Sequence, residues 1–274
     1  MLAPEAIAAY RKDGFHFPLD ILTAAEAAAL RARLEAVEAV QGGPLRAAMR
    51  HKPHLLFPWL HDLVRHPRIL AAVADVLGPD LLCWSTTFFI KEAADRGFVS
   101  WHQDATYWGL SAPEVATVWL ALTPATRASG CMKFIPGSQA RQVAHRDTFD
   151  PDNLLTRGQE VAVRVHEADA VLVELAPGQA SLHHVMLVHG SAPNRSADRR
   201  IGFAIRYIPT HIRQIAGERD SATLVRGADR FGHFDPEPAP AAELAPDAVA
   251  LHAAIMERQQ RVLYRGTDRA GFRD

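Results

Sequence analysis

The stretch Trp101-His102-Gln103-Asp104 carries two metal-binding side chains separated by a single residue. In an extended segment, residues i and i+2 project to the same face, so His102 and Asp104 can reach one metal ion from a single strand end. Val188-His189-Gly190-Ser191 offers a third ligand further along the chain. Two imidazoles and one carboxylate that leave the opposite face of the metal open are typical of non-haem Fe(II) oxygenases. The spacing therefore predicts a metal site built from His102, Asp104 and His189.

The sequence on both sides of this stretch is rich in β-forming residues. Turn signals such as Ile135-Pro136-Gly137-Ser138 and Ala176-Pro177-Gly178 separate the β-rich segments. Short strands joined by Gly/Pro turns, without helices between them, favour an antiparallel sandwich or barrel over a parallel sheet. The predicted strands cover residues 81–90, 115–122, 170–175, 179–188 and 201–208.

Helices are predicted before and after the β-rich part. Residues 4–13 suit a short helix, and Thr23-Ala24-Ala25-Glu26 has the form of a capping box that begins an alanine-rich helix ending near residue 40. Residues 67–77 and residues 246 to about 263 are two further expected helices. The intervening stretch from about 221 to 240 looks irregular. The expected fold class is mainly β with flanking helices.

Composition limits the classes of function. Lys plus Arg (30) nearly balances Asp plus Glu (31), which gives no support for a nucleic-acid partner. No apolar run approaches the ~20 residues of a membrane helix. The start, Met1-Leu2-Ala3-Pro4-Glu5, lacks the pattern of a signal peptide, and the 2 cysteines are expected to be reduced thiols. We expect a cytoplasmic protein that acts on a small molecule, without a nucleic-acid or membrane partner; the sequence leaves its oligomeric state open.

Three motifs together resemble those of the phytanoyl-CoA dioxygenase family. They are His102-Gln103-Asp104, Ile135-Pro136-Gly137-Ser138, and His189-Gly190-Ser191-Ala192-Pro193-Asn194 followed by an arginine. Asp13-Gly14-Phe15 extends the resemblance, so that it spans roughly residues 5 to 210. It implies a double-stranded β-helix (a cupin-like jelly roll) and an Fe(II)- and 2-oxoglutarate-dependent dioxygenase, a hydroxylase that consumes dioxygen and releases succinate and carbon dioxide.

The domain organisation follows from this resemblance. We expect one domain over residues 1–274. Within it, a helical part covers about residues 1–80, the jelly-roll core about 81–210, and a C-terminal lid and helix about 211–274. The stretch 220–236 is the candidate lid.

The resemblance also assigns roles to residues of the co-substrate site. The position of the anchoring arginine in the family selects Arg200, not Arg199, for the distal carboxylate of 2-oxoglutarate, which a bidentate guanidinium fits well. Strand alternation would then turn Arg199 outward as a solvated charge and leave small residues beside Arg200 to make space for the ligand. Ser191, Trp119 and Lys91 are further candidates for binding 2-oxoglutarate.

Substrate contacts are predicted more loosely. Strand alternation places His183 on the same face as His189, and one of the pair His183 and His184 could reach the pocket. Halogenating members of the superfamily carry Gly or Ala where this chain has Asp104, so the carboxylate favours hydroxylation, here of an unactivated C–H bond in a small polar metabolite. The candidate substrate contacts are Tyr107, Trp108, Arg206, His184 and Arg226.

Two other classes of function fit the same residues. A zinc-dependent hydrolase can use two histidines and an aspartate with water as the fourth ligand. A jelly roll can also be a binding protein without catalysis. The complete ligand set argues against the second alternative, and a buried arginine matched to a dicarboxylate would argue against the first.

Overall fold

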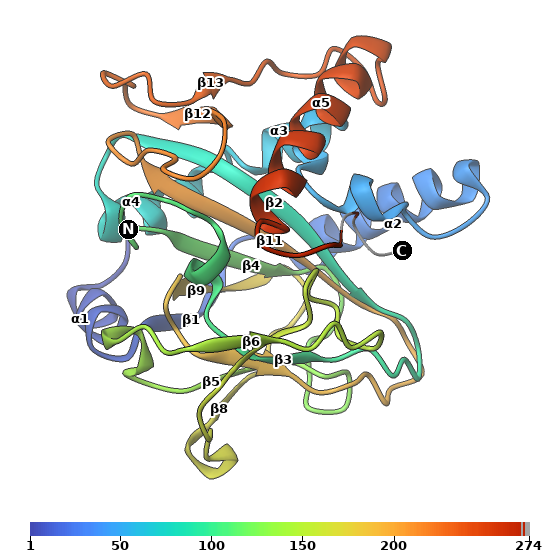
Figure 1. Ribbon diagram of the computed structural model, residues 1–274. Coiled ribbons are helices and arrows are strands. Elements are labelled where there is room, and N and C mark those ends of the chain that lie inside the picture. Colours follow the sequence, from blue (N-terminus) through green and yellow to red (C-terminus); the bar gives the residue numbers. More distant parts are fainter. Residues whose placement is uncertain (270, 272–274) are drawn as a thin grey trace.

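The computed structural model describes residues 1–269 and 271, and its described part is built around two antiparallel β-sheets with helices on the outside (Figure 1). The larger sheet has the order β1-β9-β4-β11-β2-β12-β13 and the smaller one β3-β10-β5-β8. The single parallel pair in these two sheets is β12 with β13. This is the expected double-stranded β-helix. The strand bounds are β1 (Phe15–Asp20), β2 (Leu81–Lys91), β3 (Val99–His102), β4 (Ala116–Ala121), β5 (Met132–Phe134), β8 (Val171–Val173), β9 (Gln179–His184), β10 (His189–Ser191), β11 (Arg200–Pro209), β12 (Ser221–Arg226) and β13 (Asp235–Pro236).

A short hairpin and five α-helices complete the described fold. The hairpin pairs β6 (His145–Asp147) with β7 (Gln159–Val161). The predicted capping box is present: the Glu26 N–H donates to Thr23 Oγ1 over 3.2 Å, and the Thr23 N–H donates to Glu26 Oε2 over 2.7 Å. Among the described residues, no helix is long and apolar enough to cross a membrane. The helices are α1 (Pro4–Asp13), α2 (Ala24–Gln41), α3 (Pro58–Leu63), α4 (Pro67–Leu77) and α5 (Pro246–Leu263).

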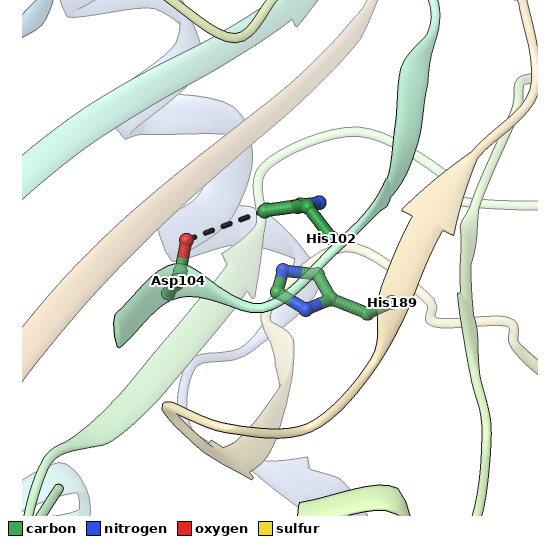
Figure 2. Close-up of side chains that lie close together, drawn as sticks. All are labelled: His102, Asp104 and His189. Carbon is green, nitrogen blue, oxygen red and sulfur yellow. Dashed lines mark ion pairs between the residues drawn. The ribbon is translucent and has the colours of Figure 1, made fainter. Parts of the chain in front are cut away.

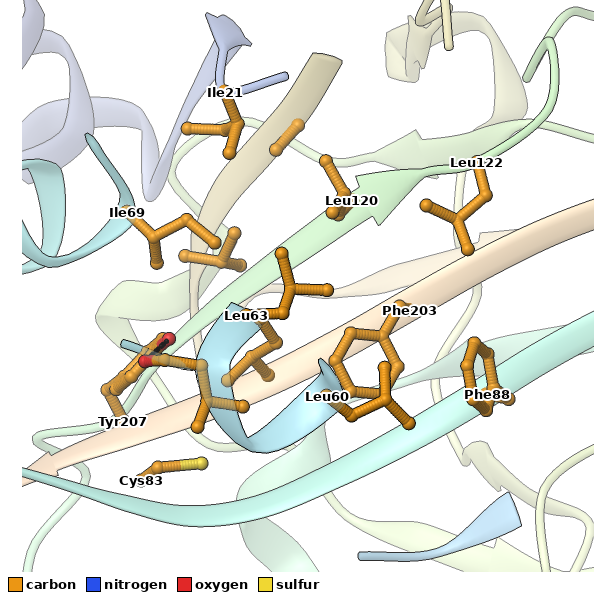
Figure 3. Close-up of a cluster of buried hydrophobic side chains, with 14 of the residues drawn as sticks. Ile21, Leu60, Leu63, Ile69, Cys83, Phe88, Leu120, Leu122, Phe203 and Tyr207 are labelled. Carbon is orange, nitrogen blue, oxygen red and sulfur yellow. Dashed lines mark hydrogen bonds between the residues drawn. The ribbon is translucent and has the colours of Figure 1, made fainter. Parts of the chain in front are cut away.

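Strand β11 divides the molecule into an apolar layer and a polar interior. Its outward residues Ile201, Phe203, Ile205 and Tyr207 are buried in the main hydrophobic cluster, where residues of α3 and α4 meet the larger sheet (Figure 3). Burial of each such side chain contributes roughly 1.5–3 kcal/mol. Because neighbouring side chains on a strand alternate, Arg200, Gly202, Ala204 and Arg206 face the interior instead. The outer layer thus fixes which side chains point inward.

The terminal segments contribute more to the sheet than the sequence predicted. β1 was not expected, yet it pairs with β9 along the edge of the larger sheet, with Phe15 opposite His183. The stretch expected to be irregular contains β12, which pairs with β2. The N-terminal part (about 1–80) and the C-terminal part (about 211–274) therefore each supply a strand to the larger sheet in addition to their helices.

Buried polar contacts hold the strands at the two ends of the candidate lid at residues 220–236, and its role as a lid stays a prediction. Glu237, which follows β13, is fully buried and accepts hydrogen bonds from Lys52 Nζ (2.6 Å) and Thr223 Oγ1 (2.7 Å). His54 Nε2 lies 3.2 Å from the same carboxylate. Breaking a buried ion pair of this kind by removing one partner costs roughly 3–5 kcal/mol. These contacts fix β12 and Glu237 in the core, whereas residues 226–232 are largely exposed.

Candidate metal centre and substrate cleft

The three predicted metal ligands converge at the mouth of the jelly roll (Figure 2). His102 ends β3 and His189 begins β10, and the two residues are directly opposite in this antiparallel pair. Asp104 begins the 3-10 helix η3 (Asp104–Tyr107). One ligand atom from each residue lies within 4.8 Å of the other two, and all three residues are buried. The structure therefore brings together the three residues that the sequence spacing selected.

Hydrogen bonds orient both imidazoles toward the common point. His102 Nδ1 lies 2.9 Å from the Ser100 carbonyl oxygen, and His189 Nδ1 lies 2.9 Å from the Leu187 carbonyl oxygen. A carbonyl oxygen only accepts, so the proton of each neutral ring is on Nδ1 and Nε2 keeps its lone pair. This outer hydrogen bond is the one that metal-binding histidines normally make. Both Nε2 atoms are thus prepared to coordinate a metal.

The ionisation states of the site suit a cation. Burial opposes ionisation of Asp104, but the contact with His102 and the charge of Arg206 outweigh burial, and the pKa of Asp104 falls well below its usual range. Burial and the neighbouring His102 lower the pKa of His189 to about 4. At neutral pH His189 is consequently a neutral imidazole and Asp104 an ionised carboxylate, which are the ligand forms that a divalent metal requires.

Next to these ligands, a small cavity is lined by residues of β4, β9 and β11. Arg200 is 1% exposed, its Nη1 donates to the Gly130 carbonyl over 3.3 Å, and its Nε and Nη2 have no partner among the described residues. The guanidinium carbon lies 5.1 Å from the centre of the Trp119 ring. Burial lowers the pKa of Arg200 to about 10, so it remains a cation at neutral pH. An enclosed guanidinium with unused donors fits the distal carboxylate of a dicarboxylic acid.

Lys91 and Ser191 lie beside this arginine. Lys91 is directly opposite Arg200 in the β2–β11 pair, and its Nζ donates to Ser191 Oγ over 2.7 Å and to the Ala192 carbonyl over 2.5 Å. Burial and the charge of Arg200 lower the pKa of Lys91 to about 6. Ser191 lines the cavity, whereas Lys91 supports Ser191 from behind.

Two expectations about this end of β11 were wrong. A Cβ on Gly202 would lie 1.8 Å from Trp119 Cζ2, so the indole ring, and not a ligand, occupies the space that this small residue leaves. Arg199 is not a solvated charge: it forms ion pairs of 2.6 Å with Glu38 of α2 and with Glu92 after β2. Glu38 and Glu92 are distant in sequence from Arg199. Strand alternation could therefore predict that Arg199 points outward, but it could not predict these ion pairs.

The two adjacent histidines of β9 face opposite sides. His183 lines the metal cavity, its ring centre is 5.1 Å from that of His189, and its Nδ1 is buried without a partner among the described residues. His184 accepts a hydrogen bond from the Met186 N–H over 3.1 Å and lines neither the metal cavity nor the cleft next to it. The structure therefore brings His183, and not His184, to the metal cavity, and the expected substrate contact at His184 stays a prediction.

A larger cleft opens next to the metal cavity and encloses about 1290 Å³, mouth included. Phe89, Asp104 and Arg206 line both spaces, so the cleft leads directly to the metal ligands. Tyr107 and Trp108 form part of its wall, as expected from the sequence. Arg226 lies at the exposed end of β12, opposite Leu81, and lines neither space. The structure does not bring Arg226 to the site, and its expected substrate contact stays a prediction.

Sequence reasoning missed the opposite wall of this cleft. Residues 154–157 and the last turns of α5, including Gln259 and Val262, line it. Arg157 joins the two parts: it pairs with Asp147, and its Nη1 donates to the Leu263 carbonyl over 2.8 Å. The helix itself was predicted, but nothing in its pattern indicated that it would pack over the metal site.

Known proteins resemble the chain in sequence and in fold. The sequence model of the family described as phytanoyl-CoA dioxygenase (PhyH) matches residues 10–202. A probable alpha-ketoglutarate-dependent hypophosphite dioxygenase of Stutzerimonas stutzeri is 29% identical over 159 residues, which cover 57% of this chain and 54% of the relative. An L-proline trans-4-hydroxylase of Streptomyces griseoviridis is 27% identical over 164 residues, which cover 53% of this chain and 61% of that enzyme. The chain thus spans about half to three fifths of these curated relatives.

Solved structures cover more of the chain. A non-heme monooxygenase, ThoJ, in its apo form superposes with a TM-score of 0.84 at 39% identity, over 94% of this chain and 97% of that one. The nickel complex of ThoJ gives a TM-score of 0.80 at 37% identity, over 94% and 98%. The similarity to ThoJ includes the C-terminal part, which lies beyond the residues matched by the family.

Proposed function

The chain belongs to the phytanoyl-CoA dioxygenase family, and from that premise we propose that it is an Fe(II)- and 2-oxoglutarate-dependent dioxygenase that hydroxylates an unactivated C–H bond of a small polar metabolite, with release of succinate and carbon dioxide. The observation that carries this proposal is the pairing of an open His/Asp/His site with the enclosed, unpaired Arg200 in one cavity. A zinc-dependent hydrolase would need the first feature and not the second.

The residues present fit both implied ligands. His102, Asp104 and His189 would hold Fe(II) through two Nε2 atoms and a carboxylate oxygen. Arg200 would bind the distal carboxylate of 2-oxoglutarate through its unused Nε and Nη2 donors, with Ser191 and Trp119 beside it. Bound Fe(II) would supply the activation of dioxygen that is coupled to oxidative decarboxylation of 2-oxoglutarate.

The other side chains of the site would exclude water and position the substrate. Phe89, Met132 and Ala204 line the metal cavity and keep bulk water from it. The adjoining cleft would hold the substrate so that one C–H bond points past Phe89 and Asp104 toward the metal. Orientation of reacting groups of this kind accounts for much of enzymatic rate enhancement.

The named relatives support a small polar substrate. One is named for L-proline and another for hypophosphite, and both compounds are small and polar. ThoJ is described as a monooxygenase, which agrees with insertion of one oxygen atom. The cleft of this chain combines an aromatic wall with a buried cation, and such a lining suits a molecule with one polar end.

The proposal is tested by incubating the Fe(II)-loaded protein with 2-oxoglutarate, 18O-labelled dioxygen and a metabolite extract. We expect a product that gains one oxygen atom carrying the heavy label. A product that instead loses two hydrogens, or that takes its oxygen from water, would contradict hydroxylation.

A further inference from the structure

Arg206 is a buried cation at the boundary between the metal cavity and the substrate cleft. It lines both spaces and is 7% exposed. Its Nη1 donates to Thr87 Oγ1 over 2.8 Å, and its Nε is enclosed without a partner. Within the described chain no acceptor bonds to Nη2, and Nη2 is not among the enclosed atoms, so it faces the open space.

The contacts that Arg206 makes do not offset the free-energy cost of burying its charge. The guanidinium carbon lies 5.1 Å from the centre of the Trp108 ring and 6.0 Å from that of Phe89. The attraction between a cation and two aromatic rings is smaller than the cost of removing a guanidinium ion from water. Among the described residues no Asp or Glu forms an ion pair with Arg206. The acidic side chain that acts on the charge of Arg206 is Asp104, a metal ligand that forms no ion pair with it. The Nε donor of the guanidinium thus keeps no partner among the described residues.

Other arginines of the same cleft do not share this property. Arg157 is ion-paired with Asp147, and Arg258 Nη1 lies 3.2 Å from Asp235 Oδ2. Arg50 also lines the cleft, but it is only half-buried and its Nε donates to the Leu45 carbonyl over 2.9 Å. Arg206 is thus the cation of the described lining that is both enclosed and without an acidic partner.

We propose that Arg206 binds a carboxylate of the substrate, so that this enzyme acts on a small carboxylic acid. This inference rests on the proposed function and names the substrate class of its site. A planar guanidinium matches a carboxylate better than any other single side chain does. With the carboxylate at Arg206, the rest of the molecule would lie between Trp108 and the adjoining cleft wall, with a nearby C–H bond facing the metal ligands.

A rival role for Arg206 is to hold the metal ligand Asp104. The charge of Arg206 contributes to the low pKa of Asp104, although the two residues form no ion pair. The two roles predict that replacing Arg206 weakens the binding of different ligands. A residue that positions Asp104 affects metal affinity, whereas a substrate anchor affects the binding of carboxylates at unchanged metal affinity.

The test uses a panel of small aliphatic and aromatic carboxylic acids, each beside its primary amide, with protein loaded with Mn(II) and saturated with 2-oxoglutarate. Paramagnetic broadening of the probe NMR signals reports binding close to the metal, and saturation with 2-oxoglutarate keeps the probes from Arg200. We expect broadening of the NMR signals of the carboxylic acids without broadening of those of their amides.

Arg206→Gln should weaken carboxylate binding at least tenfold while leaving the dissociation constants for Mn(II) and 2-oxoglutarate within about twofold of the wild-type values. The matched control is Arg164→Gln, which alters an exposed arginine that lines neither the cavity nor the cleft and should change neither carboxylate binding nor these constants.

A second variant separates binding from folding. Arg206→Met removes the charge at similar length, and its Tm should equal or exceed that of the wild type, because an unpaired buried ion is no longer desolvated. A clear fall in Tm would show that Arg206 serves the fold and would overturn the proposal.

Four further outcomes would also overturn it: equal broadening of acids and amides, no broadening by any acid, unchanged carboxylate binding in Arg206→Gln, or loss of carboxylate binding in Arg50→Gln alone. A tenfold loss of Mn(II) affinity in Arg206→Gln would assign the residue to Asp104 instead. If the wild type fails to bind either metal or 2-oxoglutarate, the proposed function is contradicted, and the role of Arg206 in substrate binding with it. If the wild type binds both normally but does not prefer carboxylic acids to amides, only the role of Arg206 is contradicted.

Discussion

The two ends of the inner face of β11 carry buried arginines in different surroundings. Arg200 lies in a cavity of about 420 Å³ next to Trp119, whereas Arg206 borders the cleft of about 1290 Å³. Both guanidiniums keep donors without protein partners. Desolvation costs several kcal/mol per ion, while a cation–π contact returns about 0.5–2 kcal/mol. We infer from the comparison that one strand presents two carboxylate sites, one in the smaller cavity for the co-substrate and one at the larger cleft for the substrate.

The metal ligands line the cavity that both arginines border, and removal of a ligand should have the largest effect on activity. His189→Ala removes one of three ligands, and activity should fall by more than the ~10–100-fold that loss of an outer hydrogen-bond partner costs. Iron content by elemental analysis and succinate formation check this. His184→Ala is the matched control, since that neighbouring histidine lines neither space. Full activity and iron content in His189→Ala would show that the ligand assignment is wrong.

Substitution of Arg200, in the smaller cavity, should have the next largest effect. Truncation of a charge-assisted contact inside a pocket costs roughly 2–5 kcal/mol, so Arg200→Ala should raise the apparent constant for 2-oxoglutarate about thirty-fold or more, at ~1.4 kcal/mol per tenfold. Arg199→Ala should leave that constant nearly unchanged and instead lower stability, because Arg199 ties α2 to the sheet through Glu38. Steady-state kinetics at varied 2-oxoglutarate settles the point: an effect at Arg199 without one at Arg200 reverses the assignment.

Lys91, which lies beside Arg200, should make the affinity for 2-oxoglutarate depend on pH, and this effect should be smaller. Its pKa is lowered to about 6, so the side chain is largely neutral above that pH in the free protein. A bound dicarboxylate favours the ammonium form, and binding therefore takes up a proton. The affinity for 2-oxoglutarate should fall as pH rises from 6 to 8, by less than tenfold per pH unit. Lys91→Met should remove this slope, and an identical slope in both proteins would exclude Lys91 as its source.

The sequence predicted local features well and long-range pairings poorly. The one-residue spacing of His102 and Asp104 and the capping box at Thr23 depend on neighbouring residues, and both are present. β1 contains Pro18 and is a strand because of its pairing with β9. β12 is likewise held by β2 and by the buried carboxylate of Glu237. No local pattern reports such partners.

The same limit applies to the site. The family resemblance selected Arg200, and strand alternation then placed Arg206 on the same inward face of β11. It could not show that Trp119 fills the space beside Gly202, or that α5 packs over the cleft. Those facts depend on tertiary packing, in which the neighbouring side chain comes from a distant part of the chain.

The most direct test of this account compares metals in one preparation. The metal-free protein is reconstituted with Fe(II) or with Zn(II), and succinate release from 2-oxoglutarate is measured in air. The account predicts succinate with Fe(II), none with Zn(II), and loss of the Fe(II)-dependent signal in Asp104→Ala, because that carboxylate is one of the three ligands. Substrate turnover by the Zn(II) protein without consumption of 2-oxoglutarate would contradict it and identify a hydrolase.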